Sequence, residues 1–250
     1  MTAESWTQAV RHHVGLGRLL PLGGPRDGAW ITEAAAGAVL RGVAREVPGV
    51  RVGALRVGLA HPAEAAEPVV APPPGALPPG ALRLTADFAA TAVDPLPETA
   101  ERLRRALAEA AERRLGLAVT EVDLRVTALL DDGEPEPEAG NGAENPAEPV
   151  RAPRPPSARA ATDADEVRAG TAALAVPGAG RLTSALGGLG RAVRVEERRG
   201  ETSLAHRHVR VELTVTPARR ALDVAGEVRA AVRDALPDRP TVTLLVTAVE

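Results

Sequence analysis

Val47-Pro48-Gly49 and Val176-Pro177-Gly178 decide the fold, because the same succession of sequence patterns surrounds each turn. A helical pattern precedes each turn. Two alternating strands follow it, separated by an amphipathic helix at 95–115 in the first copy and at 217–236 in the second. A chain that repeats a pattern in this way is interpreted through its repeat. The sequence therefore predicts two small domains of one type instead of one large enzyme.

The predicted strands alternate between apolar and polar side chains. They span 82–93 and 119–130 in the first copy, and 209–216 and 241–249 in the second. A sheet with one apolar face needs helices on that side only. The expected fold class is therefore α/β (α+β), with two tandem two-layer sandwiches, each a small sheet with helices on one face. The polar face is left wet or is covered by a partner.

Composition divides the chain further. Residues 68–80 contain six prolines, and the segment that begins at residue 131 contains seven carboxylates before its first basic residue. Such a segment cannot bury enough apolar surface to order itself. We expect an amphipathic leader at 1–26, a first domain at 27–130 with a Pro-rich insertion at 68–80, a disordered acidic and Pro-rich linker at 131–161, and a second, divergent domain at 162–250.

The leader carries apolar residues close to one helical stripe. A stripe of this kind docks on a membrane surface or a partner, or it packs on its own domain. The residues predicted for partner docking are Trp6, Val10, Leu16, Leu19 and Leu20.

The residue types that are missing restrict the chemistry. The chain has no Cys, no Tyr and no Lys, so its 30 basic residues are all Arg. This excludes disulfides, Cys-ligated metals and the P-loop, whose Lys contacts phosphate. The four serines, Ser5, Ser157, Ser184 and Ser203, lie in no nucleophile elbow. We therefore predict no catalytic residues, no cofactor, no metal and no small-molecule substrate, in a cytoplasmic protein without a signal peptide or membrane span.

Two further clusters are candidate sites. His206, His208 and Glu212 share one face of a strand, as some metal sites require, although we expect a solvated surface there. Arginines of the second copy, including Arg194, Arg198 and Arg199, are possible anion contacts. With a net charge of -3 and no aromatic stacking platform, nucleic-acid binding is the weaker of two functional hypotheses.

The first copy resembles the alkaline shock protein family of bacterial envelope stress response proteins, and the whole chain looks like an actinobacterial, two-copy variant of that family. The resemblance is carried by Ile31-Thr32-Glu33, by Glu46-Val47-Pro48-Gly49-Val50, and by the run from Leu115-Gly116-Leu117-Ala118-Val119 to Val122-Asp123-Leu124. Asp123 stands where that family usually has Asn. The second copy is similar only in its layout.

This resemblance implies a non-enzymatic cytoplasmic scaffold. It implies a protein that self-associates as a homo-oligomer or with a sister family protein, and that a small membrane-anchoring protein holds near the membrane. The alternative is a nucleic-acid-binding or regulatory module that uses the Arg-rich second domain. The first hypothesis predicts oligomers, and the second predicts salt-dependent binding of nucleic acid.

Overall fold

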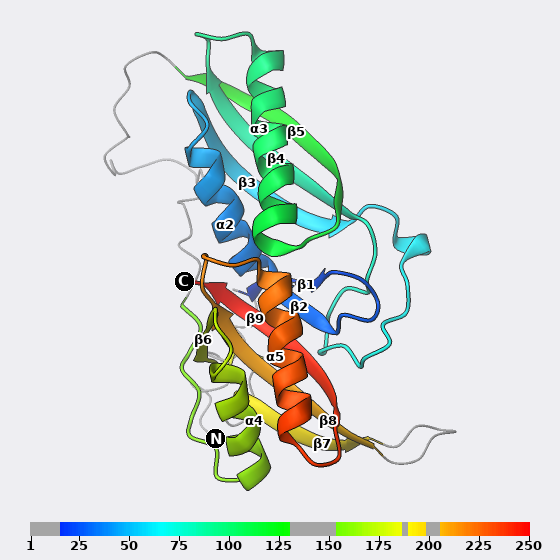
Figure 1. Ribbon diagram of the computed structural model, residues 1–250. Coiled ribbons are helices and arrows are strands. Elements are labelled where there is room, and N and C mark those ends of the chain that lie inside the picture. The colour runs from blue at the N-terminus through cyan, green and yellow to red at the C-terminus, as the bar shows by residue number, and fades with distance from the viewer. Residues whose placement is uncertain (1–15, 131–153, 187–189, 199–205) are drawn as a thin grey trace, which may run out of the picture.

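The structure, a computed structural model, describes residues 16–130, 154–186, 190–198 and 206–250. Most of the predicted leader and linker lies outside these residues. Two sheets form the described part, one above the other in Figure 1, and two α-helices pack against each of them. The predicted α+β class, with helices on the apolar face of each sheet, is confirmed.

The three-stranded sheet has the order β3-β4-β5, with β3 antiparallel and β5 parallel to β4. Its strands are β3 (Val50–Leu59), β4 (Leu82–Thr91) and β5 (Val119–Leu130). A 3₁₀ turn, η1 (Pro62–Glu64), follows β3. The helices on this sheet are α2 (Glu33–Arg45) and α3 (Leu96–Ala110), and a π-helical turn, η2 (Ala111–Leu115), extends α3.

The six-stranded sheet has the order β1-β2-β9-β8-β6, and β7 also pairs with β8. Its strands are β1 (Leu19–Leu22), β2 (Ala29–Thr32), β6 (Ala179–Leu182), β7 (Val193–Arg198), β8 (His206–Val215) and β9 (Thr241–Val249). The helices on this sheet are α4 (Ala164–Leu174) and α5 (Ala221–Ala235).

The two halves share an order of elements that extends to their turns. In each half a helix ends before a Val-Pro-Gly turn, and a parallel strand pair is joined through a helix, as β4-α3-β5 and as β8-α5-β9. Gly49 and Gly178 have φ angles of 70° and 91°, a region that glycine enters without steric cost. The Gly49 carbonyl accepts from Thr91 N and the Gly178 carbonyl from Thr216 N, both at 2.9 Å. The same turn therefore hydrogen-bonds to the end of β4 in the first half and to the residue after β8 in the second half.

The alternation predicted for β5 is wrong beyond one point. A β-bulge at Thr127 shifts the register, so that Phe88 pairs with Val126 but Ala89 pairs with Ala128. An inserted residue moves every later side chain to the other face. Ala128 therefore lies on the polar face, and Leu129 replaces it on the helix side.

The tandem arrangement is not confirmed, because β1 and β2 belong to the second half's sheet. β2 lies inside the predicted first domain, yet Ala29 to Ile31 pair in parallel with Leu244 to Val246 of β9. The helical stripe predicted for the leader is wrong at Leu19 and Leu20, which lie in β1. Their apolar run pairs with β2 as an antiparallel hairpin, so strand pairing overrides the helical spacing.

The Pro-rich insertion packs against the six-stranded sheet. Leu77 N donates to Leu19 O at 2.9 Å, Trp30 Nε1 donates to Leu77 O at 3.1 Å, and Thr243 Oγ1 donates to Ala71 O at 2.8 Å. These bonds hold the insertion, which begins in the first half, over β1, β2 and β9. On the six-stranded sheet, the face that the sequence predicted as wet or partner-covered is thus covered in part by the chain itself.

The two halves share one hydrophobic core, and they meet closely at Gly116. Gly116 has a φ angle of 88°, and a Cβ atom at this position would lie within 3.0 Å of Leu222 from the other half. Gly23 N also donates to Gly116 O at 3.1 Å. The turn after η2 therefore requires glycine both for its backbone conformation and for the contact.

We expect Gly116→Ala to lower the free energy of unfolding by about 3 kcal/mol, because it adds a steric overlap to the strain of a left-handed backbone. Gly75→Ala is the matched control. Gly75 has a φ angle of 74°, but an added Cβ atom would meet no other atom within 4 Å, so only the backbone strain applies, at about 1 kcal/mol. Urea unfolding of both variants measures the difference. Equal losses would contradict a tight junction at Gly116.

Candidate interaction surface

The three residues that the sequence offered as a metal site do not form one. His208 and Glu212 lie on the face of β8 that points away from the helices, and both are buried, whereas His206 is exposed at the start of the strand. The expected solvated surface is therefore wrong for two of the three. Across the described ranges, no group of three or more His, Asp or Glu side chains is arranged to hold a metal ion.

Glu212 holds a covering segment onto the sheet. Its Oε2 accepts from Ala185 N at 2.6 Å and from Leu186 N at 3.0 Å, and its Oε1 lies 3.5 Å from Arg210 Nε. Burial raises the pKa of Glu212, although these two N–H groups and Arg210 oppose the rise. The Glu212 side chain therefore has a structural role, because it binds residues 185 and 186 to the sheet. The sequence placed it on the correct face, but no local signal shows that residues 183–186 return to cover it.

His208 is buried on the same face. Its Nδ1 lies 2.8 Å from Thr241 Oγ1 on the neighbouring strand β9. Burial, followed by the nearby positive charge of Arg198, lowers the pKa of His208 to about 4. The imidazole is therefore neutral in the folded protein at pH 7.

The arginines of the second half face carboxylates. Arg194 and Arg198 both lie near Glu196, at 3.6 Å and 3.7 Å, and Arg207 contacts Asp165 and Asp238. Arg199 lies outside the described residues. These ion pairs neutralise much of the charge that a phosphate backbone would need.

Only three of the five predicted docking residues of the leader lie among the described residues. Trp6 and Val10 lie outside the described residues. Leu16, Leu19 and Leu20 are buried, so these three side chains are not an exposed docking face. Leu19 packs with Trp30 and Leu245 in a small cluster on the non-helical side of the six-stranded sheet.

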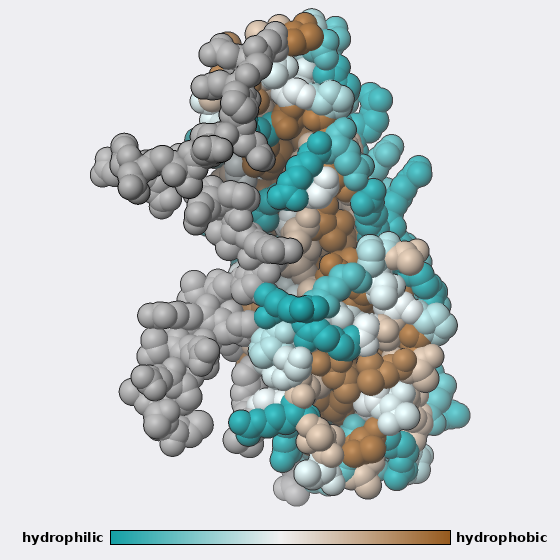
Figure 2. All heavy atoms as spheres, turned by 90° about the vertical axis from the view of Figure 1, so that its left-hand side faces the viewer, coloured by the Kyte–Doolittle hydropathy of each residue, from teal (hydrophilic) through white to brown (hydrophobic). Residues whose placement is uncertain are grey.

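The side of the molecule turned to the viewer in Figure 2 has a vertical band of apolar residues flanked by polar ones. Two exposed large apolar side chains, Val167 and Leu174, lie on α4, and an Arg168–Asp165 ion pair lies on the same helix. In the described ranges, no helix is long and apolar enough to cross a membrane.

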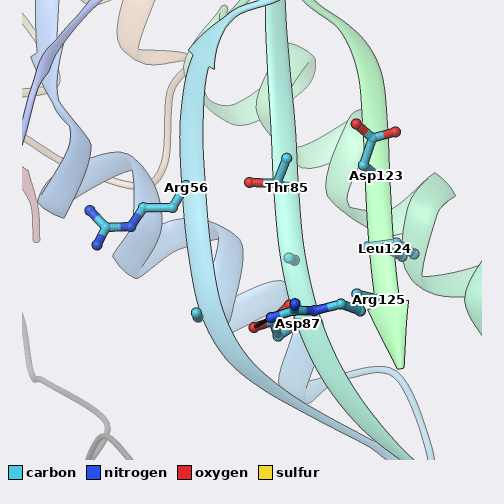
Figure 3. Close-up of a pocket in the computed structure, with 8 residues that line it drawn as sticks. Arg56, Thr85, Asp87, Asp123, Leu124 and Arg125 are labelled. Atoms are coloured by element: carbon cyan, nitrogen blue, oxygen red, sulfur yellow. Dashed lines mark hydrogen bonds and ion pairs between the residues drawn. The ribbon is translucent and has the colours of Figure 1, made fainter. Parts of the chain in front are cut away.

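The three-stranded sheet has an open polar face. Arg125 donates from Nε and Nη2 to the two carboxylate oxygens of Asp87, each at 2.8 Å, and this pair is drawn in Figure 3. The hydrogen bonds from Arg125 lower the pKa of Asp87. Arg83 contacts Glu121 at 2.5 Å and Asp123 at 3.6 Å. Cross-strand ion pairs therefore run along β4 and β5.

A groove of about 400 Å³ lies over this face. Ala54 and Arg56 of β3, Thr85 and Asp87 of β4, and Asp123 and Arg125 of β5 are among its lining residues, and Figure 3 shows Arg56 pointing away from the other labelled side chains. The groove has charges of both signs and no nucleophile paired with a base.

The edge of this sheet is also open. Among the described strands, β5 pairs with β4 alone. Val126 and Leu129, on the helix side of β5, are 42 % and 62 % exposed, and nearby Val93 is 68 % exposed. An unpaired strand edge with apolar side chains is a template for adding another strand. Strand order is a tertiary property, so the sequence predicted the polar face but not this edge.

Comparison with known proteins adds no assignment. No model of a known protein family matches the chain, and no curated protein matches it.

We expect His208 to make folding sensitive to acid. Its pKa is 6.5 when unfolded and about 4 when folded, so below pH 6.5 the unfolded chain binds a proton that the folded chain does not. Stability from this group is complete above pH 6.5 and is lost as the pH falls towards 4, by up to about 3 kcal/mol. His208→Gln should remove this part of the loss between pH 7.5 and 4.5 in urea unfolding.

His206→Gln is the control, since that side chain is exposed on the same strand. It should leave the pH dependence of unfolding unchanged. If His208→Gln retained the full acid-induced loss, the buried neutral imidazole would not be its source.

Proposed function

We propose that the protein is a non-enzymatic scaffold that self-associates through its three-stranded sheet and docks a partner at the membrane surface or a sister protein. The contrast between the two sheets carries this proposal. The six-stranded sheet is covered over β2, β9 and much of β8, where Trp30, Glu212 and Thr243 are buried. Among the described residues, the three-stranded sheet presents an open polar face and an edge of β5 that no other strand pairs with.

The composition supports a role without catalysis. Cys, Lys and Tyr, which supply many nucleophiles and proton-transfer groups, are absent from the sequence. His208 and Glu212, the buried titratable groups on β8, are each engaged by a partner within the fold. These observations favour a function that depends on surface contacts with other molecules.

The resemblance to the alkaline shock protein family supports the place and purpose of the scaffold. It favours a cytoplasmic protein that a small membrane protein holds near the membrane and that serves the envelope under stress. The docking role of Trp6 and Val10 remains a prediction from the sequence. Nucleic-acid binding has less support, because Arg194 and Arg198 share the carboxylate of Glu196.

Self-association is tested with the full chain by light scattering after size exclusion, over loading concentrations from about 1 to about 100 µM. We expect the average mass to rise with concentration above the 25.8 kDa of one chain. A constant mass of one chain over this range would contradict the proposal. Crosslinking in native cells followed by purification identifies the partner, and recovery of nucleic acid instead of protein would favour the weaker hypothesis.

A further inference from the structure

The second half shows which kind of element the strand equivalent to β5 accepts at its outer edge. β5 and β9 are equivalent strands of the repeat, each parallel to the preceding strand and joined to it through a helix. On the second half, the outer edge of β9 is filled by β2, over the pairs Ala29–Leu244 to Ile31–Val246. The matching edge of β5 has no such strand among the described residues. The repeat therefore has an edge that can accept a strand. In the second half this edge is paired with β2, and in the first half no described strand pairs with it.

The backbone of β5 shows which of its groups point outward. Leu82 N donates to Ala118 O, and Phe88 O accepts from Thr127 Oγ1, so even-numbered residues of β4 direct their backbone groups at β5. Val122 pairs with Leu84 in this register, and its carbonyl accepts instead from Arg104 Nε at 3.3 Å. In a parallel pair the backbone groups alternate between the two sides. Val122, Leu124 and Val126 therefore present their N–H and C=O groups to the free edge.

We propose that two copies of this chain join β5 to β5 in antiparallel orientation, with the two-fold axis at Leu124. This inference rests on the self-association proposed above and names its surface. Leu124 lies opposite Leu124 of the second copy, and Val122 lies opposite its Val126. A continuous six-stranded sheet results, with the helices of both copies on the same face.

Charge selects this register. With the axis at Leu124, Asp123 of each copy lies directly opposite Arg125 of the other, and residues at such positions without backbone bonds between them have close side chains. These two side chains are 65 % and 76 % exposed. Each dimer therefore forms two cross-strand ion pairs.

The neighbouring registers are less favourable, and an axis at Asp123 or at Arg125 places that residue directly opposite the same charge in the second copy. An axis at Val122 places Glu121 opposite Asp123, which is a contact of like charges. An axis at Val126 brings the bulge at Thr127 into the centre of the pairing, where its register shift interrupts the ladder. Pairing at Leu124 instead uses the regular stretch from Glu121 to Val126.

The apolar side of the strand fits the same arrangement. Val126, which is partly exposed in one chain, packs against Val122 of the second copy on the helix face. Arg104 yields the Val122 carbonyl to the N–H of Val126 in the other copy, and it keeps its contact with Glu101 at 2.6 Å. In the single chain, the Arg104 side chain therefore occupies the edge at the Val122 carbonyl, and it retains Glu101 as a partner when the edge pairs.

Charge reversal tests the register, because two variants that fail alone should pair with each other. Asp123→Arg places two arginines opposite each other, and Arg125→Asp places two aspartates there. We expect each to raise the dimer dissociation constant about 30-fold. In an equimolar mixture every contact is again between opposite charges, so a 1:1 heterodimer should form with near-native affinity, as measured by native mass spectrometry.

The control is Arg51→Asp, a charge reversal at an exposed position of β3, on the opposite edge of the same sheet and outside the groove's lining residues, which should not change the dissociation constant. Circular dichroism and thermal unfolding of each variant separate misfolding from lost association, since Arg125→Asp also removes the ion pair with Asp87. A mixture that stays monomeric, although each variant is folded, overturns the register. Dimers that persist in both single variants overturn the β5 interface but leave self-association itself standing.

Discussion

The parallel pairing of β2 with β9 joins residues near the two ends of the chain, and the rest of the arrangement depends on it. α2 follows β2 without a linker, so the position of β2 fixes where α2 begins. Thr32 caps this helix by accepting from Ala35 N at 3.2 Å, and its hydroxyl also donates to Thr247 O of β9 at 3.3 Å. Glu33 then accepts from Val57 N on β3 at 3.1 Å. One strand pair thus places the first helix against both sheets.

The two copies of the repeat have diverged in what surrounds them. The second copy gains β1 and β2 along one edge of its sheet and the Pro-rich insertion over one face. Its polar face becomes a buried layer in which Thr183 and Thr247 hydroxyls meet at 2.9 Å and Glu212 accepts two backbone bonds. Hydrogen bonds make the burial of such polar groups tolerable, although Glu212 Oε1 has no hydrogen-bond partner among the described residues and only the charge of Arg210 at 3.5 Å beside it. The first copy keeps the polar face exposed, where exposed ion pairs such as Asp87–Arg125 contribute little stability.

The features that could be predicted from the sequence are those that depend on interactions between neighbouring residues. The turns at Gly49 and Gly178, the amphipathic helices and the alternation in β4 and β8 are properties of neighbouring residues, and the sequence predicted them. The pairing of β1 and β2 within the other half's sheet is not a local property, and the short apolar run of β1 fits a helical stripe as well as a strand. The burial of His208 and Glu212 also escaped prediction. Residues 183–186, which contact Glu212, and Thr241, which contacts His208, are both distant from β8 in the sequence.

A free edge with charged side chains has a further consequence for the proposed scaffold. Two exposed ion pairs and a short ladder give weak, reversible association, and the edge residues Asp123 and Arg125 oppose uncontrolled strand addition by requiring a matching register. Weak contacts become effective when a partner concentrates the chains, since the effective concentration then replaces the bulk concentration. Anchoring at a membrane surface would supply that concentration. In the proposed assembly, the docking partner thereby controls whether β5 edges pair, because it raises the local concentration of chains. The dissociation constant of the β5 contact itself stays the same.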